Sequence, residues 1–199
     1  MKAVVLASNN ASKLREIAAL LAPLDFTVVP QSQINVPGHE ETSISFIENA
    51  ILKARHASEH TGMPAIADDS GLEVDALGGA PGVHSARYAG AGSTDQANTD
   101  KLLSALADIP AERRTARFVC LIAYLRHAND PTPIVCQGTW EGRVLPAPRG
   151  ERGFGYDPVF FVPTHGCSAA ELPSEVKNRL SHRGQALRKL VQQLGTHKN

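Results

Sequence analysis

A short apolar run that ends in two adjacent carboxylates constrains this chain more than any other stretch. Residues 64–67 are Pro-Ala-Ile-Ala, the next four are Asp68-Asp69-Ser70-Gly71, and an apolar–polar alternation then resumes through Leu72 and Val74. This order predicts a buried strand that delivers acidic side chains to its carboxyl end, where open α/β sheets bind ligands.

Neighbouring Asp residues repel each other, so a buried pair needs a cation or hydrogen-bond donors close by. A hard divalent cation, Mg²⁺ above all, is the usual counter-ion for such oxygen ligands. The same four residues also favour a turn, because Asp, Ser and Gly are all turn formers. This stretch alone leaves both a turn and a metal site open.

Length and charge narrow the class of protein. The 199 residues suffice for a single domain over 1–199, or for two lobes that share a core. Twenty basic and twenty acidic side chains balance each other, so we expect neither a nucleic acid nor a membrane as partner. The opening apolar run has five residues and no run approaches twenty, which favours a soluble, cytoplasmic protein. Three cysteines without a C-x-x-C pair argue against a disulfide framework and a zinc site.

The N-terminal stretch predicts a strand, a polar loop and a helix. The strand covers residues 3–7, and the helix carries its apolar residues at Leu14, Ile17, Ala18 and Leu21. A polar loop in this position presents backbone N–H groups and a helix dipole to an anion, and Lys13 adds a full charge. The loop lacks the P-loop pattern, and helix capping by its Ser and Asn side chains is the simpler alternative.

A second strand is predicted over 26–29, followed by a long helix over about 43–60. Its apolar stripe is expected at Ile44, Ile47, Ile51 and Ala54. Capping-box spacing between Ser45 and Glu48 allows a start one turn later. Asn49, Lys53 and His56 lie on another face of this helix. A polar face of this kind is usually exposed to solvent. Glu40 and Glu41 precede the positive end of this helix, where carboxylates are favoured and could reach a metal held by Asp69.

The second half of the chain predicts antiparallel strands and more helices. After a Gly- and Pro-rich loop over 78–88, a helix is expected over 94–106. Apolar runs at 118–125 and 134–140 are joined by Asn129-Asp130-Pro131, which predicts a β-hairpin. A further strand over 159–162 and a helical tail over 169–194, broken near Ser181, complete the pattern.

Two features of this half suggest a ligand pocket. Phe154 lies between Gly153 and Gly155, so the backbone can approach a flat ligand while the ring offers a stacking face, although loop packing alone would also explain it. Around the break at Ser181 stand three donors, Lys177, His182 and Arg183.

Taken together these stretches resemble the inosine triphosphate pyrophosphatase family, and within it the bacterial enzymes that act on dITP and XTP. The matching segments, in chain order, are residues 8–13 with Glu16, 40–42 with 46–50 and 53–54, 67–72, 78–82 with 85–88, 153–158, and 177–178 with 181–183. Asn9 stands where many members have glycine. The resemblance implies an α/β fold with an elongated mixed sheet flanked by helices, two lobes around a central nucleotide-binding cleft, and a homodimer.

The resemblance also implies roles for individual residues. The catalytic base falls on Asp69, which is also implied as a metal ligand together with Glu40 or Glu41, and the cofactor is Mg²⁺. The triphosphate would be held by Ser8, Asn9, Asn10, Ala11, Ser12, Lys13, Lys53 and Ser70. The base and sugar would be held by Phe154, Gly155, Tyr156, Asp157, Lys177, His182 and Arg183.

The implied reaction is hydrolysis of deaminated purine triphosphates (dITP, ITP, XTP) to the monophosphate and pyrophosphate. It would keep deaminated purines out of DNA and RNA. A Maf-type pyrophosphatase with another base specificity and a nucleotide-sensing module without turnover remain as alternatives. A haloacid-dehalogenase-like phosphatase is disfavoured, because Asp68-Asp69-Ser70-Gly71 lacks D-x-D spacing.

Overall fold

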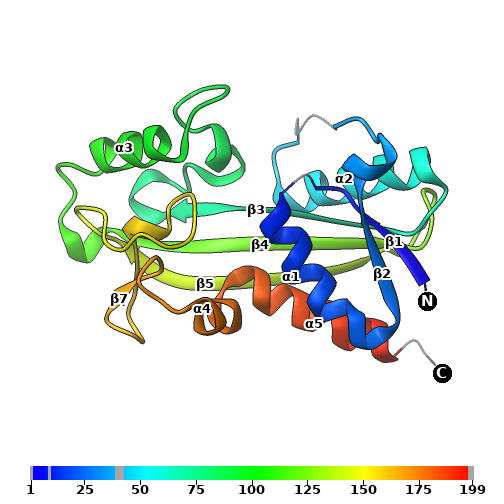
Figure 1. Cartoon of the computed structure of the whole chain (residues 1–199). Helices are drawn as coiled ribbons and strands as arrows, with labels where there is room; N and C mark the ends of the chain where they lie inside the picture. The colour runs from blue at the N-terminus through cyan, green and yellow to red at the C-terminus, as the bar shows by residue number, and fades with distance from the viewer. Residues whose placement is uncertain (1, 9, 39–42, 197–199) are drawn as a thin grey trace. The chain divides into compact units, whose positions relative to one another are not determined.

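The computed structural model describes residues 2–8, 10–38 and 43–196 (Figure 1). The strands are β1 (Lys2–Leu6), β2 (Phe26–Pro30), β3 (Ala65–Val74), β4 (Thr115–Leu125), β5 (Ile134–Val144), β6 (Phe160–Val162) and β7 (Cys167–Ser168). The α-helices are α1 (Ala11–Leu21), α2 (Phe46–Thr61), α3 (Asp95–Ala105), α4 (Ser174–Leu180) and α5 (His182–Thr196). Every strand and helix predicted above is present, with ends shifted by a few residues at most places.

The strands form one mixed sheet of seven strands in the order β2-β1-β3-β4-β5-β6-β7. β1 pairs in parallel with β2 and with β3, whereas β6 is antiparallel to both β5 and β7. β4 and β5 are neighbours joined by residues 126–133. Since a parallel connection needs about a dozen residues or more, this pair is the predicted hairpin. The expected α/β class, a mixed sheet flanked by helices, is confirmed.

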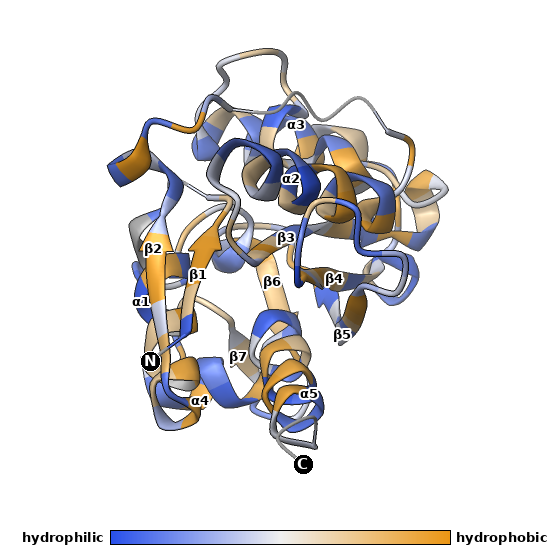
Figure 2. Cartoon of the chain, turned by 90° about the vertical axis from the view of Figure 1, so that its right-hand side faces the viewer, coloured by the Kyte–Doolittle hydropathy of each residue, from blue (hydrophilic) through white to orange (hydrophobic). Residues whose placement is uncertain are grey.

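The chain divides into two compact units, which we describe separately. The first unit comprises residues 1–69, 120–137 and 185–199. In this unit α1 and α5 cover one face of the strands and α2 covers the opposite face (Figure 1). Its core joins both helices of the first face to the sheet, through Ile17, Leu21, Ile66, Ile122, Leu187 and Leu190. The hydropathy colouring of Figure 2 shows α5 as an amphipathic helix with one hydrophobic side.

The second unit comprises residues 70–119 and 138–184. Its core is aromatic in the middle, where Phe160 packs against Phe118 at 4.5 Å and against Trp140 at 5.2 Å between ring centroids. Leu102 and Leu106 of the α3 region are buried in the same cluster. Across the described ranges of both units, no helix has the length and apolarity to cross a membrane.

The strand prediction around the two carboxylates was wrong in one respect. β3 does not end at Asp68 but runs without interruption to Val74, so Asp68 and Asp69 lie in mid-strand and no turn follows them. Both are almost completely buried, at 1% and 5% exposure. A strand can carry two buried acids only if each finds donors, and those donors come from elements far away in the sequence.

The apolar stripe predicted for α2 was also partly wrong. Ile44 precedes the helix and is 92% exposed, and Ile47 is 42% exposed. The buried face instead consists of Phe46, Asn49, Ala50, Ala54, Ala57 and Ser58. The predicted late start is confirmed, because Ser45 caps the helix: its Oγ accepts a hydrogen bond from the N–H of Glu48 at 3.4 Å and donates one to the Glu48 carboxylate at 2.6 Å. Three of the six buried residues of this helix are alanines.

Candidate active site

The two carboxylates of β3 point to opposite faces of the sheet, because successive side chains alternate along a strand. Asp68 makes an ion pair with Lys13 of α1, with 2.8 Å between Nζ and Oδ2. Asp69 makes one with Lys53 of α2, with 2.9 Å between Nζ and Oδ1. These contacts agree with the placement of α1 and α2 on opposite faces in Figure 1. The repulsion expected between adjacent acids is therefore relieved by one lysine for each of them.

Asp69 is held by two side chains of the same helix. Lys53 donates to Oδ1, and Asn49 Nδ2 donates to Oδ2 at 3.1 Å. Asn49 and Lys53 are four residues apart, which places them on one side of α2. That side was expected to be solvated, but Asn49 is 1% exposed. A carboxylate oxygen has more than one lone pair, so it can accept from more than one donor or bind a metal ion beside a donor.

The loop between β1 and α1 is shaped as a helix cap. Asn10 Oδ1 accepts a hydrogen bond from the backbone N–H of Lys13 at 3.1 Å, and Ser8 Oγ accepts one from the N–H of Asn10 at 3.2 Å. Ala11 and Ser12 are the first two residues of α1. The capping alternative and the anion-binding prediction are compatible, because N–H groups at a helix start suit an anion. Asn9 lies outside the described residues.

Of the predicted metal ligands, the structure describes only Asp69. Glu40 and Glu41 lie outside the described residues, and in the described part of the chain no three His, Cys, Asp or Glu residues are grouped closely enough to hold an ion. The chemistry of Asp69 fits a hard divalent cation, since its carboxylate offers buried oxygen atoms, the ligand atoms that such an ion prefers. Mg²⁺ is usually bound by one or two carboxylates together with substrate phosphates rather than by a complete protein cage.

The second unit holds the other predicted group in a tightly bonded loop. Asp157 Oδ2 accepts hydrogen bonds from the N–H of Phe154 and from Lys177 Nζ. Gly153 has a φ of +82°, and a Cβ at this position would collide with that carboxylate. The N–H of Gly155 donates to Asp95 Oδ2 at 2.7 Å. Asp157 therefore fixes the shape of the loop from inside.

A buried tyrosine anchors the same loop. Tyr156 is 5% exposed and donates from its hydroxyl to the carbonyl oxygen of Ser85 at 2.8 Å. Burial raises the pKa of Tyr156 well above its ordinary value, so the hydroxyl remains a donor at all physiological pH values.

Phe154 presents its ring at the surface of this loop, where it is 43% exposed. Two cations lie near the ring: Lys177 Nζ is 5.1 Å and Arg183 Cζ is 5.7 Å from its centroid. The ring of His182 stacks on Phe118 at 4.8 Å with an interplanar angle of 13°. Arg183 Nη2 also lies 3.5 Å from Ser70 Oγ. The second unit thus combines an exposed aromatic face with cationic donors.

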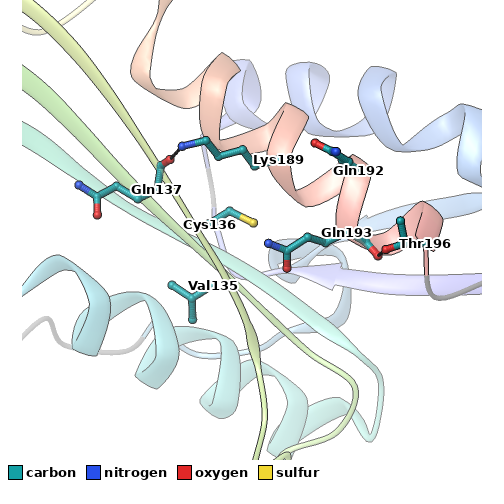
Figure 3. A pocket seen from close by; sticks show the side chains of 7 residues that line it. All are labelled: Val135, Cys136, Gln137, Lys189, Gln192, Gln193 and Thr196. Carbon is teal, nitrogen blue, oxygen red and sulfur yellow. Dashed lines mark hydrogen bonds between the residues drawn. The ribbon is translucent and has the colours of Figure 1, made fainter.

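A pocket of about 500 Å³ lies elsewhere in the first unit, beside β5 and α5 (Figure 3). Lys189 donates across it to the carbonyl oxygen of Gln137 at 2.7 Å. Its lining consists of Val135, Cys136, Gln137, Lys189, Gln192, Gln193 and Thr196. None of these is a predicted site residue.

Comparison with known proteins decides the family. Residues 4–193 match the family model described as the Ham1 family. This chain belongs to the Ham1 family. Curated relatives named dITP/XTP pyrophosphatase include those of Pectobacterium atrosepticum, 60% identical, and Shigella flexneri, 58% identical, each over 98% of both chains. A solved HAM1 protein from Coxiella burnetii superposes with a TM-score of 0.94 at 51% identity and covers 98% of this chain and 100% of its own.

The Ham1 fold assembles most predicted site residues into the two groups described above, but the sequence did not assign Asn49 or Asp95 to either group. Asn49 stood out only by its spacing from Lys53, and that spacing is equally common on solvated helix faces. Asp95 begins α3, and its contact with Gly155 spans 60 residues of sequence. No local sequence pattern predicts a contact between residues so far apart in the chain.

Proposed function

We propose that this Ham1-family protein hydrolyses deaminated purine nucleoside triphosphates, dITP, ITP and XTP, to the monophosphate and pyrophosphate. The observation that carries the proposal is Asp69, a buried carboxylate held between Lys53 and Asn49. Relatives with this enzyme name that are about 60% identical over nearly the full length support it. We further propose that residues 1–199 act as one pyrophosphatase domain, in the cytoplasm, as a homodimer.

The phosphates are assigned to residues of the first unit and to Ser70. Lys13 and Lys53 supply two positive charges, and the helix start at Ser8, Asn9, Asn10, Ala11 and Ser12 supplies backbone N–H groups. Asp69, with Glu40 or Glu41, would hold a magnesium ion. When bound, this ion neutralises charge on the phosphate oxygens.

Asp69 is also assigned the proton transfer. The reaction needs a water molecule that attacks phosphorus and loses a proton as the bond to the leaving pyrophosphate breaks. A carboxylate is a suitable acceptor for that proton when it is held in place and kept ionised. The hydrogen bonds from Lys53 and Asn49 favour the ionised form. Asp68 is assigned to holding Lys13 rather than to this step.

The base is assigned to residues of the second unit. Phe154 offers a stacking face, and Gly155 leaves the backbone next to it open. Hypoxanthine and xanthine carry an acceptor at O6 where adenine carries an amino donor. Donors from His182, Arg183 or nearby N–H groups would therefore leave adenine with donor facing donor, which is costly in a buried site. The shape and the charge of this pocket are assigned to Tyr156, Asp157 and Lys177.

Product analysis tests the proposal. The purified protein is incubated with Mg²⁺ and separately with dITP, ITP, XTP, GTP, ATP and a pyrimidine triphosphate, and the products are resolved by ion-exchange chromatography. We expect monophosphate and pyrophosphate from the first three, and no product when EDTA is present. Orthophosphate with a diphosphate would contradict the assigned reaction. Preferential hydrolysis of the pyrimidine triphosphate would favour the Maf-type alternative. Binding of a nucleotide without its hydrolysis would favour the sensing module.

A further inference from the structure

The side-chain amide of Asn49 is buried and engaged at both ends. Its Nδ2 donates to Asp69 Oδ2 at 3.1 Å, and its Oδ1 accepts a hydrogen bond from the N–H of Ser43 at 3.1 Å. Asn49 is 1% exposed and lies in the first turn of α2. The amide therefore links a backbone group that precedes the helix to the carboxylate of β3.

Only one orientation of this amide is compatible with its neighbours. If Oδ1 and Nδ2 were exchanged, an oxygen would face the carboxylate and an NH₂ group would face the N–H of Ser43. Both contacts would then be repulsive, and the N–H of Ser43 and Asp69 Oδ2 would each lose this hydrogen bond. The Asn49 amide therefore has to present its NH₂ group to Asp69 and its oxygen to Ser43.

Lys53, which also donates to Asp69, differs from Asn49 in charge and in flexibility. Lys53 reaches Oδ1 with a long, charged side chain that has several rotatable bonds and whose charge also suits a phosphate. Asn49 is short and neutral, and its amide has an acceptor already committed to Ser43. When a polyanion competes for Lys53, the bond from Lys53 to Oδ1 can be exchanged, whereas the bond from Asn49 to Oδ2 does not depend on that exchange.

We propose that Asn49 is a positioning residue that fixes the Asp69 carboxylate through Oδ2, so that Oδ1 keeps its orientation when Lys53 turns to the substrate phosphates. The proposal rests on the proposed hydrolysis of deaminated purine triphosphates. A positioning residue of this kind contributes to kcat, since it is needed while the proton moves, and contributes little to substrate binding.

Two variants separate the two ends of the amide. Asn49→Leu has a similar shape and removes both hydrogen bonds, whereas Asn49→Asp keeps an acceptor for Ser43 but no longer donates to Asp69. We expect both to lower kcat for dITP by about 10–100-fold, with KM changed less than about threefold. As a matched control, Ser58→Ala removes a buried hydrogen bond from the same helix, between Ser58 Oγ and the carbonyl of Met63. It should lower the unfolding temperature and leave kcat unchanged.

A double-mutant cycle with Asp69→Asn shows whether Asn49 acts through Asp69. In the Asp69→Asn background, Asn49→Leu should change the residual rate less than about threefold, because the group that it positions is gone. The same four proteins are unfolded in urea without substrate, where we expect the shifts of the midpoint to be non-additive. If Asn49→Leu does not fold, Asn49→Asp takes its place in both cycles.

Three results would overturn the proposal. The first is that the wild type is active and Asn49→Asp has the same kcat. The Asn49 amide would then serve only to bind the N–H of Ser43. The second is a cycle in which the rate losses multiply and the midpoint shifts add. The third is a wild type that hydrolyses none of the triphosphates, and this result alone also refutes the proposed function.

Discussion

At the scale of single residues, Asp68 and Asp69 are neighbours in sequence but have different surroundings. Each is buried and paired with its own lysine, one from α1 and one from α2. We expect Asp69→Asn to lower kcat for dITP by about 10²–10⁴-fold, because it keeps the shape and removes the base. Asp68→Asn should mainly lower the unfolding temperature, since it removes the buried countercharge of Lys13. Equal losses of kcat in steady-state assays of the two variants would contradict this division.

Base recognition is a second matter decided by individual residues. The double variant His182→Ala, Arg183→Ala should reduce the ratio of kcat/KM for ITP over ATP by about tenfold or more, because O6 loses its proposed donors. Phe154→Leu is the comparison, since it weakens stacking for every purine alike and should leave the ratio nearly unchanged. Full retention of the preference for ITP in the double variant would show that other donors read the base.

At the scale of elements, the connection between β4 and β5 is stabilised by one buried acid. Asp130 accepts hydrogen bonds from the guanidinium of Arg126 and from the backbone N–H groups of Arg126 and Thr132. These bonds, the one from the guanidinium foremost, hold the pKa of Asp130 well below its ordinary value of 3.8. A group with a lowered folded-state pKa stabilises the fold above its ordinary pKa and loses that contribution as pH falls.

Asp130→Asn should therefore destabilise the protein in a pH-dependent way. At pH 7 we expect a loss of about 1 kcal/mol in the free energy of unfolding, or about 2–4 °C in Tm. Below pH 3.8 the Asp130 carboxyl of the unfolded wild type becomes protonated while that of the folded protein is still ionised, so the wild type loses stability. The difference between the two proteins should therefore shrink progressively as the pH falls from 3.8 toward the lowered folded-state pKa. Urea unfolding of both proteins at several pH values measures it. A difference that stays constant from pH 7 to pH 3 would assign the effect to packing instead.

The elements also show what sequence alone can predict. Strand and helix types followed from periodicity and from capping signals such as Ser45 with Glu48. The turn at Asp68-Asp69 could not be excluded, because the donors that allow two buried acids lie in α1 and α2. Likewise the face of α2 depends on contacts with the strands, so Ile44 and Ile47, which fit the pattern, are exposed. Long-range partners decided both cases.

At the scale of the whole molecule, three strands each contribute residues to both compact units. The unit boundaries cut β3 after Asp69, β4 after Val119 and β5 after Gln137. Each unit has a core of its own, and the single tryptophan, Trp140, belongs to the core of the second unit. Because the strands are continuous, we expect the two cores to unfold in one cooperative transition.

Leu190→Ala tests this cooperativity. Leu190 is fully buried in the first unit, so its truncation should cost about 2–5 kcal/mol. The fluorescence of Trp140 and the far-UV circular dichroism should shift together to lower urea concentration. A fluorescence transition that stays at its wild-type midpoint would mean that the units unfold independently.

The central claim is the choice of substrate, and one kinetic comparison tests it most directly. With Mg²⁺ present, kcat/KM is measured for dITP, ITP and XTP against ATP and GTP, with release of pyrophosphate as the readout. We predict a preference of at least about 100-fold for the deaminated purines over ATP. In Asp69→Asn the hydrolysis of every substrate should fall together, because the base serves all of them. Equal values for ITP and ATP would contradict the account, since the triphosphate would then be hydrolysed without recognition of its base.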